Sequence, residues 1–238
     1  MKEINCGDWN EFREHVTDNY SQYYGFIFRG HRDSTWSLKS TLTRLLENIS
    51  QDIDDYLAQE QQLKNFRIAI RGLTPRAPKE LSNEDLWTLG QHYGLATPLL
   101  DWTTSPYIAC YFAFEGQTTP QEGKGTIWAL NKAKLLREIG EEHLELKIIE
   151  TLSNGNARIV SQAGLFTLFP TGVDLQDWLT AHKLDHHLTK INIENEYRIE
   201  ALNDLRLMNI TGSSIYPDLH GASTACNLRL QNVSENWE

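Results

Sequence analysis

The chain has 238 residues, which is enough for one large domain or two small ones around a buried core. Its 32 Asp and Glu residues outnumber its 22 Lys and Arg residues, which gives a net charge of -10. A protein that holds nucleic acid through its phosphates needs a basic surface. The composition therefore disfavours nucleic acid as a partner, although a local basic pocket is compatible with it.

The sequence predicts neither a membrane span nor a disulfide framework. No apolar run approaches the roughly 20 residues that cross a bilayer, and the first residues lack the apolar stretch of a signal peptide. The three cysteines, Cys6, Cys110 and Cys226, are odd in number and far apart. Free thiols in a reducing cytoplasm are therefore expected, and no membrane partner is expected.

Apolar spacing and turn residues predict an alternation of helices and strands. The predicted helices are 8–18, 54–70, 83–93, 107–115, 132–150 and 197–209, and Asp8 is expected to be the N-cap of the first. The predicted strands are 23–28, 36–38, 97–103, 125–130, 164–169 and 188–193. This mixture predicts an α+β fold of mixed small β-sheets with surrounding helices. Residues 1–238 are expected to form one continuous domain with a C-terminal tail.

Arg29 and Gly30 directly follow the apolar strand at 23–28. A strand end fixes a ligand-facing side chain, and glycine allows a ligand to approach the backbone closely. The planar guanidinium of Arg29 suits a phosphate or a carboxylate. The same side chain could instead brace the fold by pairing with an internal carboxylate, and both interpretations stay open.

The segment 91–106 is dense in residue types that carry chemistry. His92 can act as an acid, a base or a neutral donor near pH 7. Asp101 is expected among apolar neighbours, so it needs a partner or a shifted pKa. Thr103 and Ser105 offer hydroxyls at the junction between a predicted strand and the helix that begins at Pro106. Such a junction can bind an anion, or the hydroxyls can simply cap the helix.

A His-x-x-x-His-His group occurs at His182, His186 and His187. Positions i and i+4 of a helix share a face, as two metal ligands require. No glutamate follows the first histidine in the His-Glu-x-x-His arrangement, so a solvated polar segment is favoured and no metal is predicted. Motifs of serine hydrolases, P-loop proteins and Rossmann folds are also missing from the sequence.

Two motifs resemble the FRG domain, a bacterial and phage family named for its tripeptide. The first is Phe-Arg-Gly at 28–30, followed by Trp-x-Leu at 36–38. The second runs from Gln-His-Tyr-Gly-Leu at 91–95 through Leu-Leu-Asp-Trp-Thr at 99–103 to Ser-Pro at 105–106. Weaker matches near 158–167 and 210–221 extend the resemblance over about residues 20–222. One departure is Pro98, where the family pattern is expected to carry an arginine.

A fainter resemblance is to ADP-ribosyltransferases, and it implies NAD as the substrate. Arg29 would hold a phosphate or ribose, and Thr103 or Ser105 the nicotinamide ribose. The expected third strand, 159–166, places Gln162 where the family carries its acid. The acidic role would then fall to a carboxylate elsewhere in the chain, with Glu60, Asp101 and Glu196 as candidates. The pocket would also be lined by Gln91, His92 and Tyr93.

Three functional hypotheses follow. The first is an enzyme of phage defence or of a toxin system, which cleaves the glycosidic bond of NAD or transfers ADP-ribose. The second is a non-catalytic module that senses a nucleotide or binds a partner protein, and the glutamine in place of an acid favours it. The third is a nuclease built on His92, Asp101 and Glu60, which the acidic composition disfavours.

Overall fold

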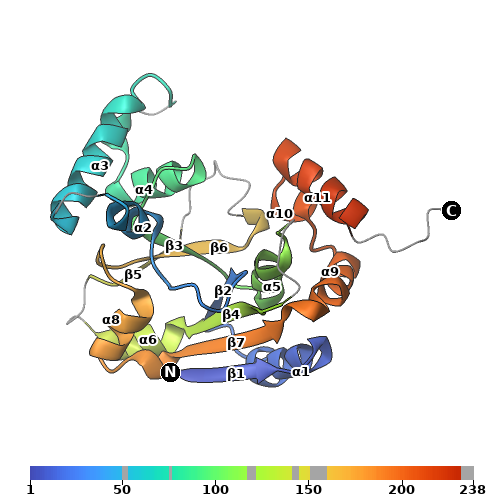
Figure 1. The fold of residues 1–238 in the computed structure, drawn as a ribbon. Helices are drawn as coiled ribbons and strands as arrows, with labels where there is room; N and C mark the ends of the chain where they lie inside the picture. Colours follow the sequence, from blue (N-terminus) through green and yellow to red (C-terminus); the bar gives the residue numbers. More distant parts are fainter. Residues whose placement is uncertain (50–52, 75–76, 117–121, 141–144, 151–159, 232–238) are drawn as a thin grey trace.

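Seven strands form one mixed sheet in the computed structural model, which describes residues 1–49, 53–74, 77–116, 122–140, 145–150 and 160–231 (Figure 1). The strand order is β1-β7-β4-β2-β3-β6-β5; β1 runs parallel to β7, and all other neighbours are antiparallel. The strands are β1 (Lys2–Cys6), β2 (Phe26–His31), β3 (Leu99–Thr103), β4 (Lys124–Asn131), β5 (Lys147–Ile149), β6 (Gly164–Leu168) and β7 (Leu188–Glu194).

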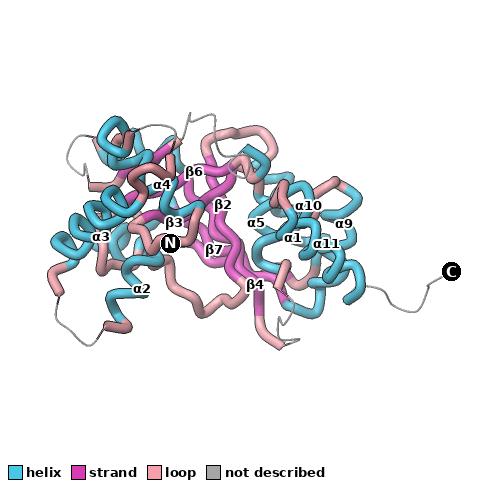
Figure 2. Tube along the Cα trace, turned by 90° about the horizontal axis from the view of Figure 1, so that it is seen from above, coloured by secondary structure: helices cyan, strands magenta, loops and turns pink. Residues whose placement is uncertain are grey.

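Helices cover both faces of this sheet (Figure 2). The helices are α1 (Trp9–Tyr20), α2 (Thr41–Glu47), α3 (Asp55–Ala69), α4 (Asn83–His92), α5 (Pro106–Phe114), α6 (Lys132–Ile139), α8 (Leu175–Ala181), α9 (Arg198–Leu207), α10 (Gly212–Ile215) and α11 (Leu219–Gln231). Short 3-10 turns are η1 (Pro78–Glu80), η2 (Asp185–His187) and η3 (Asn195–Tyr197). Among the described residues, no helix combines the length and apolarity that a membrane crossing requires. The predicted α+β fold is confirmed.

The alternation of side chains along β2 separates two cores. Phe28 packs with α1, α5 and α9, whereas its neighbour Ile27 packs with α6 and α8 on the opposite face. A third core lies under α3 and α4, where Leu99 of β3 and Phe166 of β6 are buried. The central strands are therefore covered on both faces, and β2 is fixed among them.

Several sequence predictions need correction. One seven-stranded sheet replaces the expected small sheets. Residues 36–38 form a loop and not a strand, and they pair with none of the described strands of the sheet. The helix predicted at 132–150 ends at Ile139, where Gly140 adopts a positive φ of 57°, and residues 147–149 form β5. Residues 141–144 of that prediction lie outside the described part of the chain.

Gly30 is required by helix packing. A Cβ atom at this position would overlap the carbonyl oxygen of Ala109 and lie 2.8 Å from the backbone nitrogen of Ala113, both on α5. The missing side chain thus lets α5 lie directly on β2. The sequence predicted that Gly30 gives room to a ligand, but α5 occupies that room.

We expect Gly30→Ala to lower the free energy of unfolding by at least about 1–3 kcal/mol, because the added methyl group forces α5 away from β2. Chemical denaturation measures this loss. Gly7→Ala is the matched control: its Cβ would meet only the flexible end of Glu11, so a change within about 0.5 kcal/mol is expected. Equal stability of the two variants would contradict the packing role.

Candidate functional site

A cleft opens where β2 and β3 part. These antiparallel strands pair at a single position, Phe28 opposite Thr103. Beyond that pair, residues 28–32 and 101–103 line a cavity of about 890 Å³, which we call the central cleft. Residues 35–37, Arg44, Phe112, Glu115, Gln162 and Tyr216 complete the described lining. The divergence of two neighbouring strands therefore creates the site.

Arg29 bridges the parted strands. Its Nη1 donates a hydrogen bond to the Asp101 carbonyl oxygen at 2.8 Å and lies 3.6 Å from the carboxylate of the same residue. The Arg29 side chain is 16% exposed and that of Asp101 is 56% exposed. Burial lowers the pKa of Arg29, whereas Asp101 raises it, and an arginine keeps its charge under such shifts. Arg29 is thus a brace and also a fixed positive charge in the cleft.

His31 lies behind Arg29 and stays neutral. Burial, followed by the charge of Arg29, lowers the pKa of His31 to about 3. Arg29 Nε donates to His31 Nε2 at 3.1 Å, and Trp128 Nε1 donates to His31 Nδ1 at 3.2 Å. A neutral imidazole has only one acceptor nitrogen. His31 can therefore satisfy one of these two donors at a time.

The depressed pKa of His31 predicts a pH-dependent loss of stability. The ordinary pKa is 6.5, so between pH 6.5 and about 3 the unfolded chain binds more protons at this residue than the folded protein does. The free energy of unfolding then falls as the pH is lowered through this range. We expect His31→Gln to lessen this fall by up to about 1.4 kcal/mol per pH unit. Urea unfolding from pH 7 to 4.5 measures the difference, and identical slopes would contradict it.

A second arginine and a carboxylate face each other across the cleft. Arg32 Nη2 lies 3.5 Å from Glu115 Oε1, and the Glu115 side chain is only 12% exposed. Tyr216 donates its hydroxyl to the Glu115 carboxylate, with oxygen distances of 3.0 and 3.1 Å. Burial and then the Glu115 charge raise the pKa of Tyr216, so its hydroxyl keeps its proton. Glu115 is therefore held in one orientation from two sides.

Arg44 of α2 adds a third positive charge to the lining. Its Nη1 donates to the Lys39 carbonyl oxygen at 2.9 Å, and its charge lowers the pKa values of both Arg29 and His31. Among the described lining residues, three arginines therefore face two carboxylates. The cleft carries an excess of positive charge although the whole chain has a net charge of -10.

Two tryptophans line the cleft in different ways. Trp36 is 52% exposed, and its ring centroid lies 6.1 Å from that of His31. Trp102 is 3% exposed, and its Nε1 donates to Thr167 Oγ1 at 3.0 Å. Trp36 thus offers an aromatic face to a ligand, whereas Trp102 belongs to the core.

This contrast predicts different effects of the two alanine substitutions. Trp102→Ala is expected to cost about 3–5 kcal/mol, because it leaves a cavity in the core and removes the partner of Thr167. Trp36→Ala is expected to change stability by less than about 0.5 kcal/mol. Urea unfolding of both variants checks this, and a stable Trp102→Ala protein would refute the core assignment.

Five of the predicted site residues line the central cleft: Arg29, Gly30, Asp101, Thr103 and Gln162. Gln91 approaches it indirectly, since its Nε2 donates to both Asp101 carboxylate oxygens at 3.0 and 3.1 Å. The described lining does not include the other predicted residues, His92, Tyr93, Ser105, Glu60 and Glu196. Tyr93 is 76% exposed at the end of α4, and Glu60 accepts from Tyr56 on α3.

The hydroxyl residues before α5 serve the helix start. The Ser105 hydroxyl accepts from the Ile108 backbone nitrogen at 3.3 Å, as an N-cap does. Thr103 Oγ1 accepts from the Ser105 nitrogen at 3.1 Å and is 2% exposed. Gln162 lies in the turn before β6 and not in the strand, and its Nε2 donates to the Ile215 carbonyl oxygen at 3.4 Å. Of the expected third strand at 159–166, residue 159 lies outside the described residues.

Sequence reasoning missed most of the cleft. Arg32, Trp36, Arg44, Glu115 and Tyr216 line it but were not among the predicted site residues. Arg32 and Trp36 follow the Phe-Arg-Gly tripeptide closely, so charge and aromaticity near that motif could have indicated them. Glu115 and Tyr216 are 101 residues apart, and no local pattern could have paired them.

These features define an α+β protein with an open, positively charged cleft between two parted strands. Residues 24–122 match the FRG domain family, the family that the sequence motifs resembled. The match includes Arg29, Trp36, Asp101 and Glu115, whereas Tyr216 lies outside it. Neither the curated proteins nor the solved structures give a significant match to the chain.

Proposed function

We propose that the central cleft binds NAD or a related nucleotide and that its phosphates lie against the arginines. The observation that carries this proposal is the concentration of Arg29, Arg32 and Arg44 around one cavity of an acidic chain. Arginine presents a planar fork of donors that matches phosphate oxygens. The cavity of about 890 Å³ falls in the size range of ligand sites, roughly 300–1,000 Å³.

Aromatic groups in the lining support a nucleotide over a simple anion. The half-exposed Trp36 stands at the cleft, and aromatic side chains stack on bases with a gain of about 1–3 kcal/mol per base. Phe112 and Tyr216, whose ring centroids lie 6.2 Å apart, provide further apolar surface. An anionic group at the arginines and a flat ring at Trp36 would use both kinds of surface.

The reaction we propose is cleavage of the bond between nicotinamide and ribose. The glycosidic C–N bond breaks, nicotinamide leaves with the bonding electrons, and water adds to the ribose carbon, giving ADP-ribose, nicotinamide and a proton. A carboxylate near the ribose carbon would stabilise the positive charge that develops there in the transition state. Asp101 and Glu115 are the carboxylates of the described lining, and we assign this role to Glu115 because Arg32 and Tyr216 orient it.

A non-catalytic nucleotide-sensing module is the second candidate. Each lining carboxylate already lies within 4 Å of an arginine, which reduces the negative charge available to a transition state. Gln162, where the resemblance implies an acid, donates to a backbone carbonyl. A nuclease has less support, because the arginine-paired carboxylates of the described lining do not form a shared metal site. A role in phage defence or as a toxin stays a prediction from the family resemblances, and a cytoplasmic location stays a prediction from the cysteine content.

Thermal melting with NAD, ADP-ribose, ATP and GMP tests the binding proposal. A ligand at 100 times its Kd adds about 2.7 kcal/mol to the free energy of unfolding. We expect NAD to raise the Tm, and Arg29→Ala and Trp36→Ala to remove this rise. Arg13→Ala is the matched control, because it removes the same charge and an ion pair with Asp204 outside the described lining. If none of the four nucleotides stabilises the wild-type protein, the proposal fails.

Mass spectrometry of free nicotinamide separates the two candidates. Release of nicotinamide by the wild-type protein, lost in Glu115→Gln while NAD still raises the Tm, supports the enzyme. Stabilisation by NAD without release supports the sensing module. A Glu115→Gln protein that releases nicotinamide at the wild-type rate would refute the role of Glu115.

A further inference from the structure

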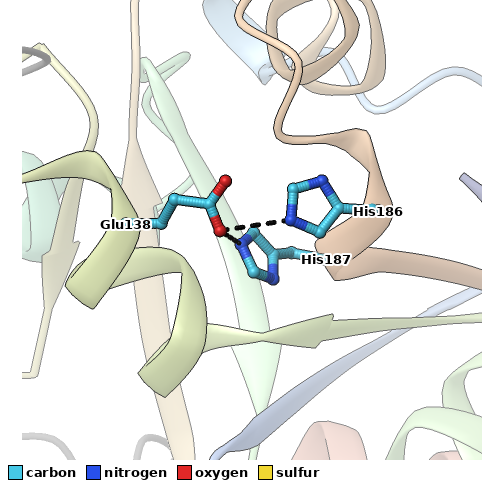
Figure 3. Close-up of side chains that lie close together, drawn as sticks. All are labelled: Glu138, His186 and His187. Carbon is cyan, nitrogen blue, oxygen red and sulfur yellow. Dashed lines mark hydrogen bonds and ion pairs between the residues drawn. The ribbon is translucent and has the colours of Figure 1, made fainter.

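Glu138, His186 and His187 form a cluster outside the described lining of the central cleft (Figure 3). Glu138 lies on α6, and the two histidines lie on η2, immediately before β7. His186 Nε2 and His187 Nε2 approach the same oxygen, Glu138 Oε2, at 3.2 and 2.8 Å. Two ring nitrogens and one carboxylate oxygen therefore converge on one point.

The second ring nitrogen of His186, Nδ1, fixes the tautomer of this side chain. His186 Nδ1 lies 3.1 Å from the Lys183 carbonyl oxygen, which can only accept a hydrogen bond. Nδ1 therefore carries the proton, and in the neutral ring Nε2 directs its lone pair at the Glu138 carboxylate. A lone pair that faces a carboxylate favours a cation at this position, either a proton on Nε2 or a metal ion. A backbone carbonyl that fixes the tautomer in this way is typical of metal-bound histidine.

We propose that Glu138, His186 and His187 bind a divalent transition-metal ion of the zinc class. Two imidazoles and one carboxylate are a ligand set that zinc uses when it keeps a fourth position for water. The three ligand atoms lie within 4.8 Å of one another. Zinc bonds of about 2.0–2.2 Å place neighbouring ligands of a tetrahedral site about 3.4 Å apart, so small side-chain movements complete the site.

The sequence favoured a solvated segment here, because it offered only the spacing of His182 and His186. The structure ends α8 at Ala181 and stacks the His182 ring on Trp178 at 4.1 Å, so His182 serves a different contact. Glu138 comes from 48 residues upstream of His186. A bound ion would therefore join α6 to the start of β7, which lies between β1 and β4 in the sheet.

The test is calorimetric titration of the chelator-treated full chain with Zn²⁺, in a Cys226→Ser background that removes the exposed thiol. We expect one Zn²⁺ per chain and a higher Tm with the ion bound. Glu138→Gln and His186→Ala alter side chains that are about half exposed, so both variants should fold. Each is expected to weaken Zn²⁺ binding at least tenfold.

His182→Ala is the matched control, since it removes a nearby histidine that stacks on Trp178 and is not one of the three proposed ligands. Unchanged affinity in this variant, with the loss in the other two, supports the site. Absence of saturable Zn²⁺ binding by the folded protein would overturn the proposal and leave the cluster as a polar contact between Glu138 and the two histidines. Affinity that falls equally in all three variants would overturn it as well.

Discussion

The Arg29 guanidinium holds β2 and β3 together where their own pairing stops. Those strands share only the Phe28–Thr103 pair, so the Asp101 carbonyl beyond it has no partner on β2. Arg29 Nη1 supplies that partner at 2.8 Å. The strands can therefore separate and form a cleft because one side chain spans the gap.

The buried charge of Arg29 also contributes to the positive charge of the cleft. An arginine without a counter-charge would cost several kcal/mol, and the Asp101 carboxylate 3.6 Å away offsets part of that cost. Asp101 is more than half exposed, however, so solvent weakens the pair, and Arg32 and Arg44 add further positive charge. An anionic ligand would be attracted by the same group that stabilises the fold. The two interpretations that the sequence left open for Arg29, brace and ligand contact, are thus compatible in this geometry.

Local patterns predicted those elements whose stability is encoded locally. The Asp8 cap of α1 and the Ser105-Pro106 start of α5 lie where signals of this kind placed them. The N-cap of α4 is Ser82 and not the predicted Asn83, and the strand predicted at 23–28 is β2 at 26–31. The edge strand β1 was missed because its partner β7 lies almost 190 residues away, and the pairing depends on contacts that no short window contains. Gly30 was assigned correctly to the cleft region but for the wrong reason, since only the packed structure places Ala109 against it.

The distinction between local signals and contacts of distant residues also applies to the chemistry of the cleft. Arg29, Arg32 and Asp101 lie within the family match at 24–122, and these positions supply its charge. Glu115 also lies there, but its orientation depends on the hydroxyl of Tyr216, which is outside the match. A carboxylate acts on a ribose only from a fixed position, so attraction of a phosphate and reaction at a sugar have different structural requirements. Under the proposed function, the matched segment would attract the phosphates, and the rest of the chain would decide whether Glu115 stands where cleavage needs it.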